Sequence, residues 1–309
     1  MKQNSLILYG KKELKWAQKE LPSLEKDEVL VKTIAGAISI GAELPQYMET
    51  DLTEKSPHYP KETGYESYGE IIEVGDEVKT LKIGDRVVAF YGHKDYGVIK
   101  NYKAILVPKG IHYSDALLTI LSCDSAKGVL KLNPKKEDKI IVTGMGTMGL
   151  LAVYFLKEYM NVYHVDVLEP NQSRGDLAKL LGAKNVFNDM SECPQDLYSY
   201  GLECSGYKEV FNSLQKALLQ GAGLCILSDG NKEIFELQPE FYKKELKIIG
   251  SSDGWDYKKH SEWYFENVKQ KGSLLINLFE LKIEKGQLIQ CFKDLNEGKV
   301  NPLKVLIEY

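Results

Sequence analysis

The sequence predicts an α/β protein in which a doubly wound parallel sheet follows a small, mostly antiparallel β domain. Short alternating apolar runs fill roughly the first 110 residues, as in antiparallel strands. From about residue 122, strand-like and helix-like runs alternate, which is typical of a parallel sheet with helical crossovers. A chain of 309 residues also exceeds what one hydrophobic core usually supports, so we expect two domains.

The amino-terminal domain is predicted from five apolar runs with period-two alternation. Clusters such as LPSLEKDE, KSPHYPKETG and KIGD separate the runs and are rich in turn-forming residues. The expected strands are residues 5–10, 28–38, 67–75, 85–92 and 102–108.

The second domain is predicted from the change of period. The expected strands are 139–144, 161–170, 185–189, 197–206, 223–230 and 245–254, and the expected helices are 147–160, 172–183 and 209–220. Two amphipathic helices (258–270 and 285–298) and a strand (303–309) follow. Patterning alone leaves this last segment free to join either domain.

Composition excludes several classes of function. With 43% hydrophobic and 27% charged residues the chain is ordinary for a globular protein, and its net charge of −4 favours neither nucleic acid nor an anionic membrane as partner. The apolar run at the amino terminus is too short for a signal peptide, and no later run approaches membrane-spanning length, so we expect a cytoplasmic protein. Five widely spaced cysteines without a C-x-x-C pair predict neither disulfides nor a zinc knuckle.

The motif GMGTMG, residues 144–149, predicts a dinucleotide site. A G-x-G-x-x-G is weak alone, but here a strand precedes it and a helix opens inside it. The first glycine permits the tight turn, the second lets a diphosphate approach the backbone, and the third lets helix and strand pack closely.

An acidic residue about 20 positions after the last glycine should bind the ribose. Glu169 has this spacing, whereas Asp166 lies inside a strand and is expected to face a neighbouring layer. A carboxylate repels a 2′-phosphate, which favours NAD over NADP, although Arg174 could reach the same ribose and keep NADP possible. The expected cofactor-binding residues are Gly144, Gly146, Thr147, Met148, Gly149, Glu169, Arg174, Ser205 and Ser228.

The stretch GYESYGEIIEVGDEV, followed by KIGDRVV, resembles the G-H-E and G-D-R-V signature of the medium-chain dehydrogenase/reductase superfamily. The resemblance implies a GroES-like catalytic domain (1–122, completed by 254–309) and a Rossmann domain (123–253). AISIGAELPQY and AFYGHKDYGVI are also similar to the bacteriochlorophyllide side-chain and polyol dehydrogenase branch, from which Ala42 departs because a threonine is expected there.

Zinc-dependent members of this superfamily hold a catalytic metal through three ligand positions. In this chain the resemblance places them at Ser39, Tyr65 and Cys123, and only the cysteine is a good zinc ligand. We therefore expect no catalytic zinc. Glu66 and His93 could hold an ion together with Cys123, so an atypical metal site stays open as an alternative.

Without a metal, hydrogen-bond donors must stabilise the charge that develops on the substrate oxygen during hydride transfer. The hydroxyls of Tyr65 and Ser39 are the candidate donors, His93 is the candidate proton relay for Tyr65, and Glu66 is expected to orient rather than react. The alternatives are a strand-edge tyrosine, a solvated histidine and a Glu66 paired with Arg86.

The function predicted is NAD(P)-dependent hydride transfer to or from a small alcohol or carbonyl compound, without zinc. One alternative is a zinc-dependent alcohol or polyol dehydrogenase with atypical ligands. Another is a non-catalytic dinucleotide-binding redox sensor or interaction module, motivated by the loss of two ligand positions. Dimers are common among the relatives, so we expect a homodimer.

Overall fold

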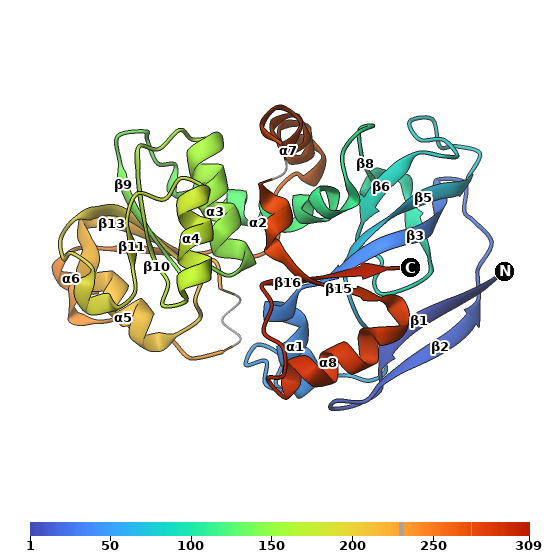
Figure 1. Ribbon diagram of the computed structural model, residues 1–309, viewed down its shortest axis with the longest axis horizontal. Helices are drawn as coiled ribbons and strands as arrows, with labels where there is room; N and C mark the ends of the chain where they lie inside the picture. Colours follow the sequence, from blue (N-terminus) through green and yellow to red (C-terminus); the bar gives the residue numbers. More distant parts are fainter. Residues whose placement is uncertain (229–231, 273) are drawn as a thin grey trace. The chain divides into compact units, whose positions relative to one another are not determined.

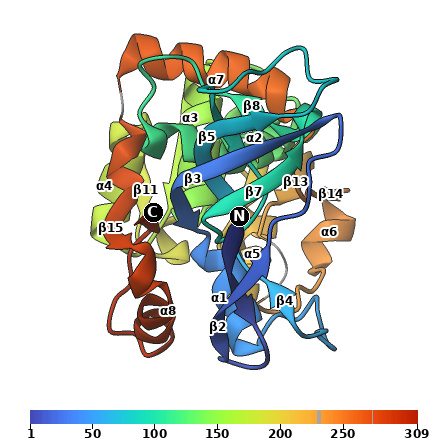
Figure 2. The ribbon, with the colours of Figure 1, turned by 90° about the vertical axis from the view of Figure 1, so that its right-hand side faces the viewer.

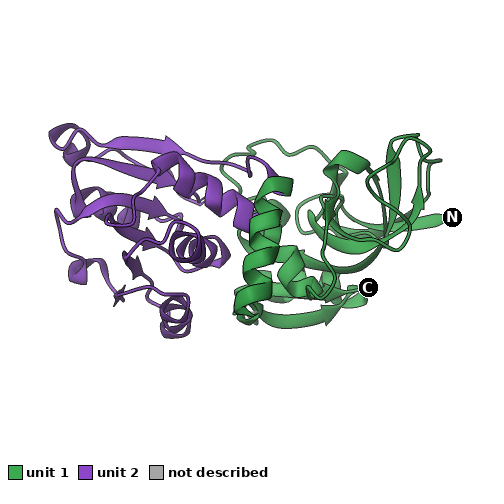
Figure 3. Ribbon diagram, turned by 90° about the horizontal axis from the view of Figure 1, so that it is seen from above, with its two compact units in different colours: residues 1–119, 258–309 green, residues 120–257 purple. Residues whose placement is uncertain are grey.

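The computed structural model describes residues 1–228, 232–272 and 274–309, which form two compact units (Figure 3). Unit 1 comprises Met1–Thr119 and Lys258–Tyr309, and unit 2 comprises Ile120–Tyr257. The expected domain boundaries at 122 and 253 differ from these by three and four residues (122 against 119, 253 against 257). The first boundary lies inside one long helix, α2 (Tyr113–Leu132).

Unit 1 contains two sheets. A three-stranded sheet has the order β2-β1-β4, and a seven-stranded sheet has the order β15-β16-β3-β5-β6-β8 with β7 paired to β3. The strands are β1 (Lys2–Leu8), β2 (Leu14–Glu20), β3 (Glu28–Ile38), β4 (Lys61–Glu62), β5 (Glu66–Val74), β6 (Arg86–Ala89), β7 (Tyr96–Lys100), β8 (Ile105–Leu106), β15 (Phe279–Glu284) and β16 (Lys304–Glu308).

The carboxyl-terminal segment belongs to unit 1, because β16 pairs antiparallel with β3 and parallel with β15. Both chain ends lie in this unit (Figure 1). Its helices are α1 (Ile40–Met48), α7 (Tyr257–Lys271, whose first residue is in unit 2) and α8 (Leu288–Asn296), with 3-10 turns at Asn101–Lys103, Leu275–Leu278 and Lys285–Gln287. Helices α1 and α8 pack on each other through Tyr47 and Phe292, whose ring centroids are 5.4 Å apart, and both are seen in the lower part of Figure 2.

Unit 2 is a six-stranded, wholly parallel sheet with the order β11-β10-β9-β12-β13-β14. The strands are β9 (Lys139–Thr143), β10 (His164–Leu168), β11 (Val186–Phe187), β12 (Tyr198–Glu203), β13 (Leu218–Ile226) and β14 (Lys247–Gly250), and the helices are α3 (Thr147–Glu158), α4 (Gln172–Leu180), α5 (Lys208–Ala217) and α6 (Pro239–Lys243), with a 3-10 turn at Met190–Glu192. The strand order reverses between β9 and β12, the point where such sheets bind ligands.

The predicted fold class is confirmed, and the local differences have simple causes. The helix expected over 209–220 ends at Ala217 because the chain then enters β13, where Leu218 is fully buried. The strand expected over 102–108 is mostly a 3-10 turn followed by the two-residue β8. Among the described residues, no helix combines the length and apolar character needed to cross a bilayer.

Candidate functional site

The glycine turn of unit 2 connects β9 to α3 at the carboxyl ends of the strands. Gly144 has a φ of 81°, a value that favours glycine. A Cβ on Gly149 would lie 1.9 Å from the Gly144 carbonyl oxygen, so only a glycine lets α3 start this close to the turn. A Cβ on Gly146 would meet no described atom within 4 Å. The turn thus combines two crowded glycines with one that faces open space, as the approach of a diphosphate requires.

Thr147 and Met148 form the first turn of α3, directly after the N-cap Gly146. The first amides of a helix have no acceptor within the helix and lie at the positive end of its dipole. This segment therefore offers an anion both hydrogen-bond donors and a favourable field.

The two acidic candidates have different surroundings. Asp166, inside β10, accepts a hydrogen bond from the Tyr198 hydroxyl at 2.9 Å, so a tyrosine of β12, two strands away in the same sheet, engages its carboxylate. Glu169, directly after β10, accepts hydrogen bonds from the amides of Met145 at 2.7 Å and Asn171 at 2.9 Å. Its carboxylate is held against the glycine turn itself.

Arg174 occupies the first turn of α4. Its amide donates a hydrogen bond at 3.2 Å to the side chain of Asn171, the N-cap residue of α4. In the sequence Arg174 lies five residues after Glu169. The guanidinium is thus carried by the helix that begins beside Glu169.

Glu203 is a buried carboxylate that the sequence patterns did not single out. It ends β12 with none of its surface exposed, and its Oε1 accepts hydrogen bonds from the amides of Ser205 (2.7 Å) and Gly206 (2.9 Å). The Ser228 hydroxyl donates to its Oε2. Ser205 and Ser228, both predicted to contact the cofactor, are therefore held by one carboxylate, and the Ser205 Cα would lie 2.8 Å from a Cβ on Gly144. The sequence signal that could have identified Glu203 is a single glutamate within the strand-like run LYSYGLECSG.

In unit 1 the hydroxyls of Tyr65 and Ser39 meet. Strands β3 and β5 pair with Ala37 opposite Glu66, which brings Ser39, just after β3, and Tyr65, just before β5, to the same end of the strand pair. The Tyr65 hydroxyl donates to Ser39 Oγ at 2.6 Å. Within the part of the chain that the structure describes, the Ser39 hydroxyl has no hydrogen-bond acceptor of its own.

His93 lies near these residues but bonds to a different group. Its Nε2 is 2.9 Å from Oε2 of Glu43, and both side chains are almost fully buried. Across the described residues, this ring hydrogen-bonds to Glu43 and not to Tyr65, whose relay partner it was expected to be. Glu43 was missed, although an acidic residue in the first turns of a helix is a recognisable signal.

Glu66 pairs with Lys304 of β16 and not with Arg86. Lys304 Nζ lies 2.6 Å from Glu66 Oε1, with the two side chains 1% and 0% exposed. Arg86 pairs instead with Glu70 at 2.8 Å. Burial raises the pKa of Glu66, and the nearby Lys304 ammonium opposes that shift. A lysine inside the apolar run LKVLIEY predicts such a buried partner.

The donors at the family's metal positions do not fit zinc. The oxygens of Ser39 and Tyr65 are hydrogen-bonded to each other, and burial raises the pKa of the Cys123 thiol to about 11, which disfavours the thiolate. The alternative ligands Glu66 and His93 are already held by the buried partners described above. In residues 1–228, 232–272 and 274–309, no three His, Cys, Asp or Glu side chains form a group suited to a metal ion.

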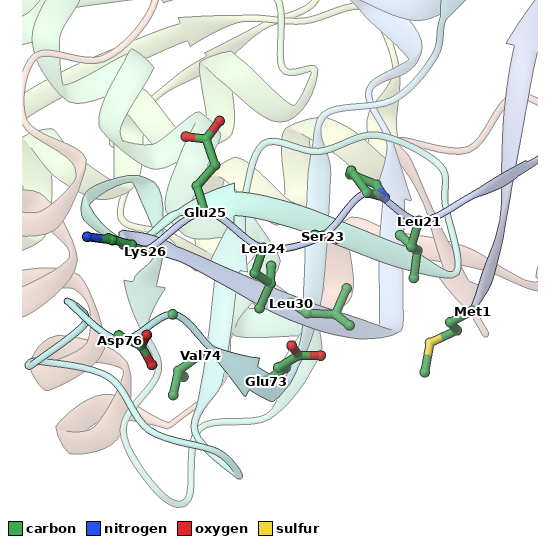
Figure 4. Close-up of a pocket in the computed structure, with 12 residues that line it drawn as sticks. Met1, Leu21, Ser23, Leu24, Glu25, Lys26, Leu30, Glu73, Val74 and Asp76 are labelled. Carbon is green, nitrogen blue, oxygen red and sulfur yellow. The ribbon is translucent and has the colours of Figure 1, made fainter.

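Unit 1 also has a pocket of about 450 Å³ beside the segment that leads into β3 (Figure 4). Leu24, Leu30 and Val74 line it together with acidic residues such as Glu73 and Asp76. No residue predicted for the site lines this pocket, so it is separate from the hydroxyl pair.

Comparison with known proteins identifies a domain in the amino-terminal part of the chain and relatives along most of its length. Residues 25–109 match the alcohol dehydrogenase GroES-like domain. The chain is 27% identical over 266 residues to L-threonine 3-dehydrogenase of Aliivibrio fischeri (strain MJ11), a match that covers 70% of this chain and 76% of the relative.

Solved structures with the same fold span nearly the whole chain. They include 2R,3R-butanediol dehydrogenase of Bacillus subtilis (TM-score 0.82, 22% identity, 99% of each chain). A second is a short chain alcohol dehydrogenase of Escherichia coli CFT073 in complex with NADH (TM-score 0.83, 19% identity, 100% of this chain and 99% of that chain). Taken with the GroES-like match and the threonine dehydrogenase relatives, these findings show that the chain carries an alcohol dehydrogenase GroES-like domain and has the fold of these dehydrogenases, and they support membership of the medium-chain dehydrogenase/reductase superfamily.

Proposed function

We propose that this protein transfers a hydride between a nicotinamide dinucleotide, preferably NAD, and a small alcohol or carbonyl compound, and that it does so without catalytic zinc. The observation that carries the proposal is the 2.6 Å hydrogen bond between Tyr65 and Ser39, at two positions where zinc-dependent relatives hold their metal. Named relatives that oxidise threonine or butanediol support an alcohol as substrate.

The hydroxyl pair supplies the stabilisation that the substrate oxygen needs. Ser39 Oγ accepts a hydrogen bond from the Tyr65 hydroxyl. This bond draws electron density from the Ser39 oxygen, so the Ser39 hydroxyl becomes a stronger hydrogen-bond donor. Because no described residue accepts that proton, we assign Ser39 to donate to the substrate oxygen, with Tyr65 donating behind it. In the reduction direction the oxygen takes the proton from Ser39, Tyr65 returns one to Ser39, and solvent water reprotonates the partly exposed Tyr65; oxidation reverses each transfer.

The nicotinamide, when bound, supplies or accepts the hydride. The chain's part is to hold the dinucleotide, and the features that support this are the open face of Gly146, the first turn of α3 and the fixed Glu169 carboxylate. A negative charge at Glu169 opposes a 2′-phosphate, which is why we propose NAD as the preferred form.

Two variants test the chemistry. Ser39→Ala and Tyr65→Phe should each lower kcat by about 100-fold with the dissociation constant for NADH unchanged, the size expected for loss of one oxyanion donor. Tyr68→Phe is the matched control, because Tyr68 is a buried tyrosine of β5, three residues after Tyr65, and should keep wild-type turnover. Activity is measured over a panel of alcohols and carbonyl compounds, and NADH binding by fluorescence titration.

The two alternatives give different results in the same experiment. NADH binding without turnover of any panel compound favours a dinucleotide-binding sensor. Stoichiometric zinc in the purified protein, with activity lost on chelation and restored by zinc, overturns the zinc-free mechanism.

A further inference from the structure

The Glu43 carboxylate links two segments that carry the hydroxyl pair. Its Oε1 accepts a hydrogen bond from the Ser39 amide at 2.8 Å, and its Oε2 lies 2.9 Å from His93 Nε2. Glu43 is 6% exposed and His93 is 1% exposed, so water competes little for either contact. One buried carboxylate thereby fixes the backbone of Ser39 to a loop that follows β6.

The same loop is fixed to the segment that carries Tyr65. The His93 amide donates to the Thr63 carbonyl at 2.8 Å. A Cβ on Gly64 would lie 2.6 Å from the His93 ring, so the imidazole packs directly against the Gly64 backbone, one residue before Tyr65. Gly64 has a φ of 76°, and both this conformation and the close ring contact favour glycine.

We propose that Glu43 and His93 are positioning residues that hold the Ser39 and Tyr65 hydroxyls at hydrogen-bond distance, an inference that rests on the proposed zinc-free function. The pair joins the start of α1 to the residues just before β5. These are the two places from which the hydroxyls project.

The contacts indicate positioning and not proton transfer. Glu43 contacts the amide of Ser39 and not its hydroxyl, and the His93 ring reaches Glu43 and not Tyr65. These hydrogen bonds therefore do not connect the hydroxyl pair to the imidazole as a proton path. They do restrict the Ser39 backbone, and a misplacement of about 1 Å at a reacting group can cost on the order of 100-fold in rate.

Three variants separate this role from alternatives. Glu43→Ala removes both contacts and should lower kcat by about 10–100-fold with NADH affinity unchanged. Glu43→Gln keeps an oxygen for the Ser39 amide and an N–H for a neutral His93, so it should recover to within about fivefold of wild type. His93→Phe keeps a ring against Gly64 but loses the bond to Glu43, and we expect an intermediate loss of kcat.

A double variant and a structure complete the test. In a Ser39→Ala background, Glu43→Ala should cause little further loss of kcat, because the group that it positions is already gone. The crystal structure of Glu43→Ala, or of His93→Phe should the alanine variant not fold, should show the Tyr65 and Ser39 oxygens beyond 3.5 Å.

The proposal is wrong if folded Glu43→Ala keeps wild-type kcat, if Glu43→Gln is as impaired as Glu43→Ala, or if the oxygens keep their separation in the variant structure. A role for the negative charge itself would produce the second result. Failure of the proposed function looks different: Ser39→Ala and Tyr65→Phe would then leave turnover unchanged, while the oxygen separation in the variant crystal would still test the positioning.

Discussion

Replacing Lys304 by methionine tests whether the buried ion pair with Glu66 holds the carboxyl-terminal strand in unit 1. The Lys304 Nζ to Glu66 Oε1 distance is 2.6 Å, and neither side chain is more than 1% exposed. Glu66 Oε2 already has no hydrogen-bond partner within the described chain. Methionine is an unbranched apolar side chain that can fill the space of the lysine stem, so the variant mainly removes the ammonium group.

The expected cost is about 3–5 kcal/mol in the free energy of unfolding at neutral pH, because the variant leaves a buried carboxylate with both oxygens unpaired. A second substitution, Glu66→Gln in the Lys304→Met background, should recover most of that loss, since burying a neutral amide costs far less than burying an unpaired charge.

The deficit should depend on pH in a defined direction. Burial already raises the Glu66 pKa above its ordinary 4.5, and removal of Lys304 raises it further. A carboxyl group with a raised pKa in the folded state binds its proton more tightly there than in the unfolded chain, so stability is lost as pH rises through this window. The deficit of Lys304→Met should therefore be small near pH 4.5 and grow toward pH 8.

Urea unfolding in a Trp255→Phe background measures this effect in unit 1 alone. The chain has three tryptophans, and the two that remain, Trp16 and Trp263, both belong to unit 1. Equal stability of Lys304→Met and its parent at pH 8, a deficit independent of pH, or no recovery by Glu66→Gln would each refute the reasoning.

Three further predictions concern the dinucleotide site and the fold. Gly146→Ala should fold with the parent's thermal midpoint but bind NADH at least tenfold more weakly in a fluorescence titration, whereas Gly149→Ala should lower the midpoint, because its Cβ would lie 1.9 Å from a carbonyl oxygen. Glu169→Gln should lower the preference for NAD over NADP in kcat/KM by at least about tenfold, and an unchanged preference would mean that another residue reads the ribose. Burial lowers the pKa of His260 to about 4. The stability that this histidine contributes is therefore complete above its ordinary pKa of 6.5 and is lost as pH falls toward 4, a decline on the order of 3 kcal/mol. His260→Gln should flatten this decline in the free energy of unfolding, measured by urea titrations across that pH range.

The sequence by itself determined the fold class and the glycine turn, because both depend on local chemistry. Period-two alternation, the change to alternating strand and helix patterns, and glycines that only certain backbone conformations require are all visible in neighbouring residues. Asp166 likewise lies inside a strand, β10, as the local pattern predicts.

Only the tertiary structure decided which charged groups pair. Lys304 lies 238 residues from Glu66, and His93 lies 50 residues from Glu43, so no local pattern could match them. The sequence offered Arg86 as an alternative partner for Glu66 and Tyr65 as the partner of His93, and both partners proved different because strand register and the return of β16 set the distances. Side chains far apart in the chain meet only where the packed sheet brings their backbones together. A buried charged side chain then pairs with the oppositely charged side chain that this packing places next to it.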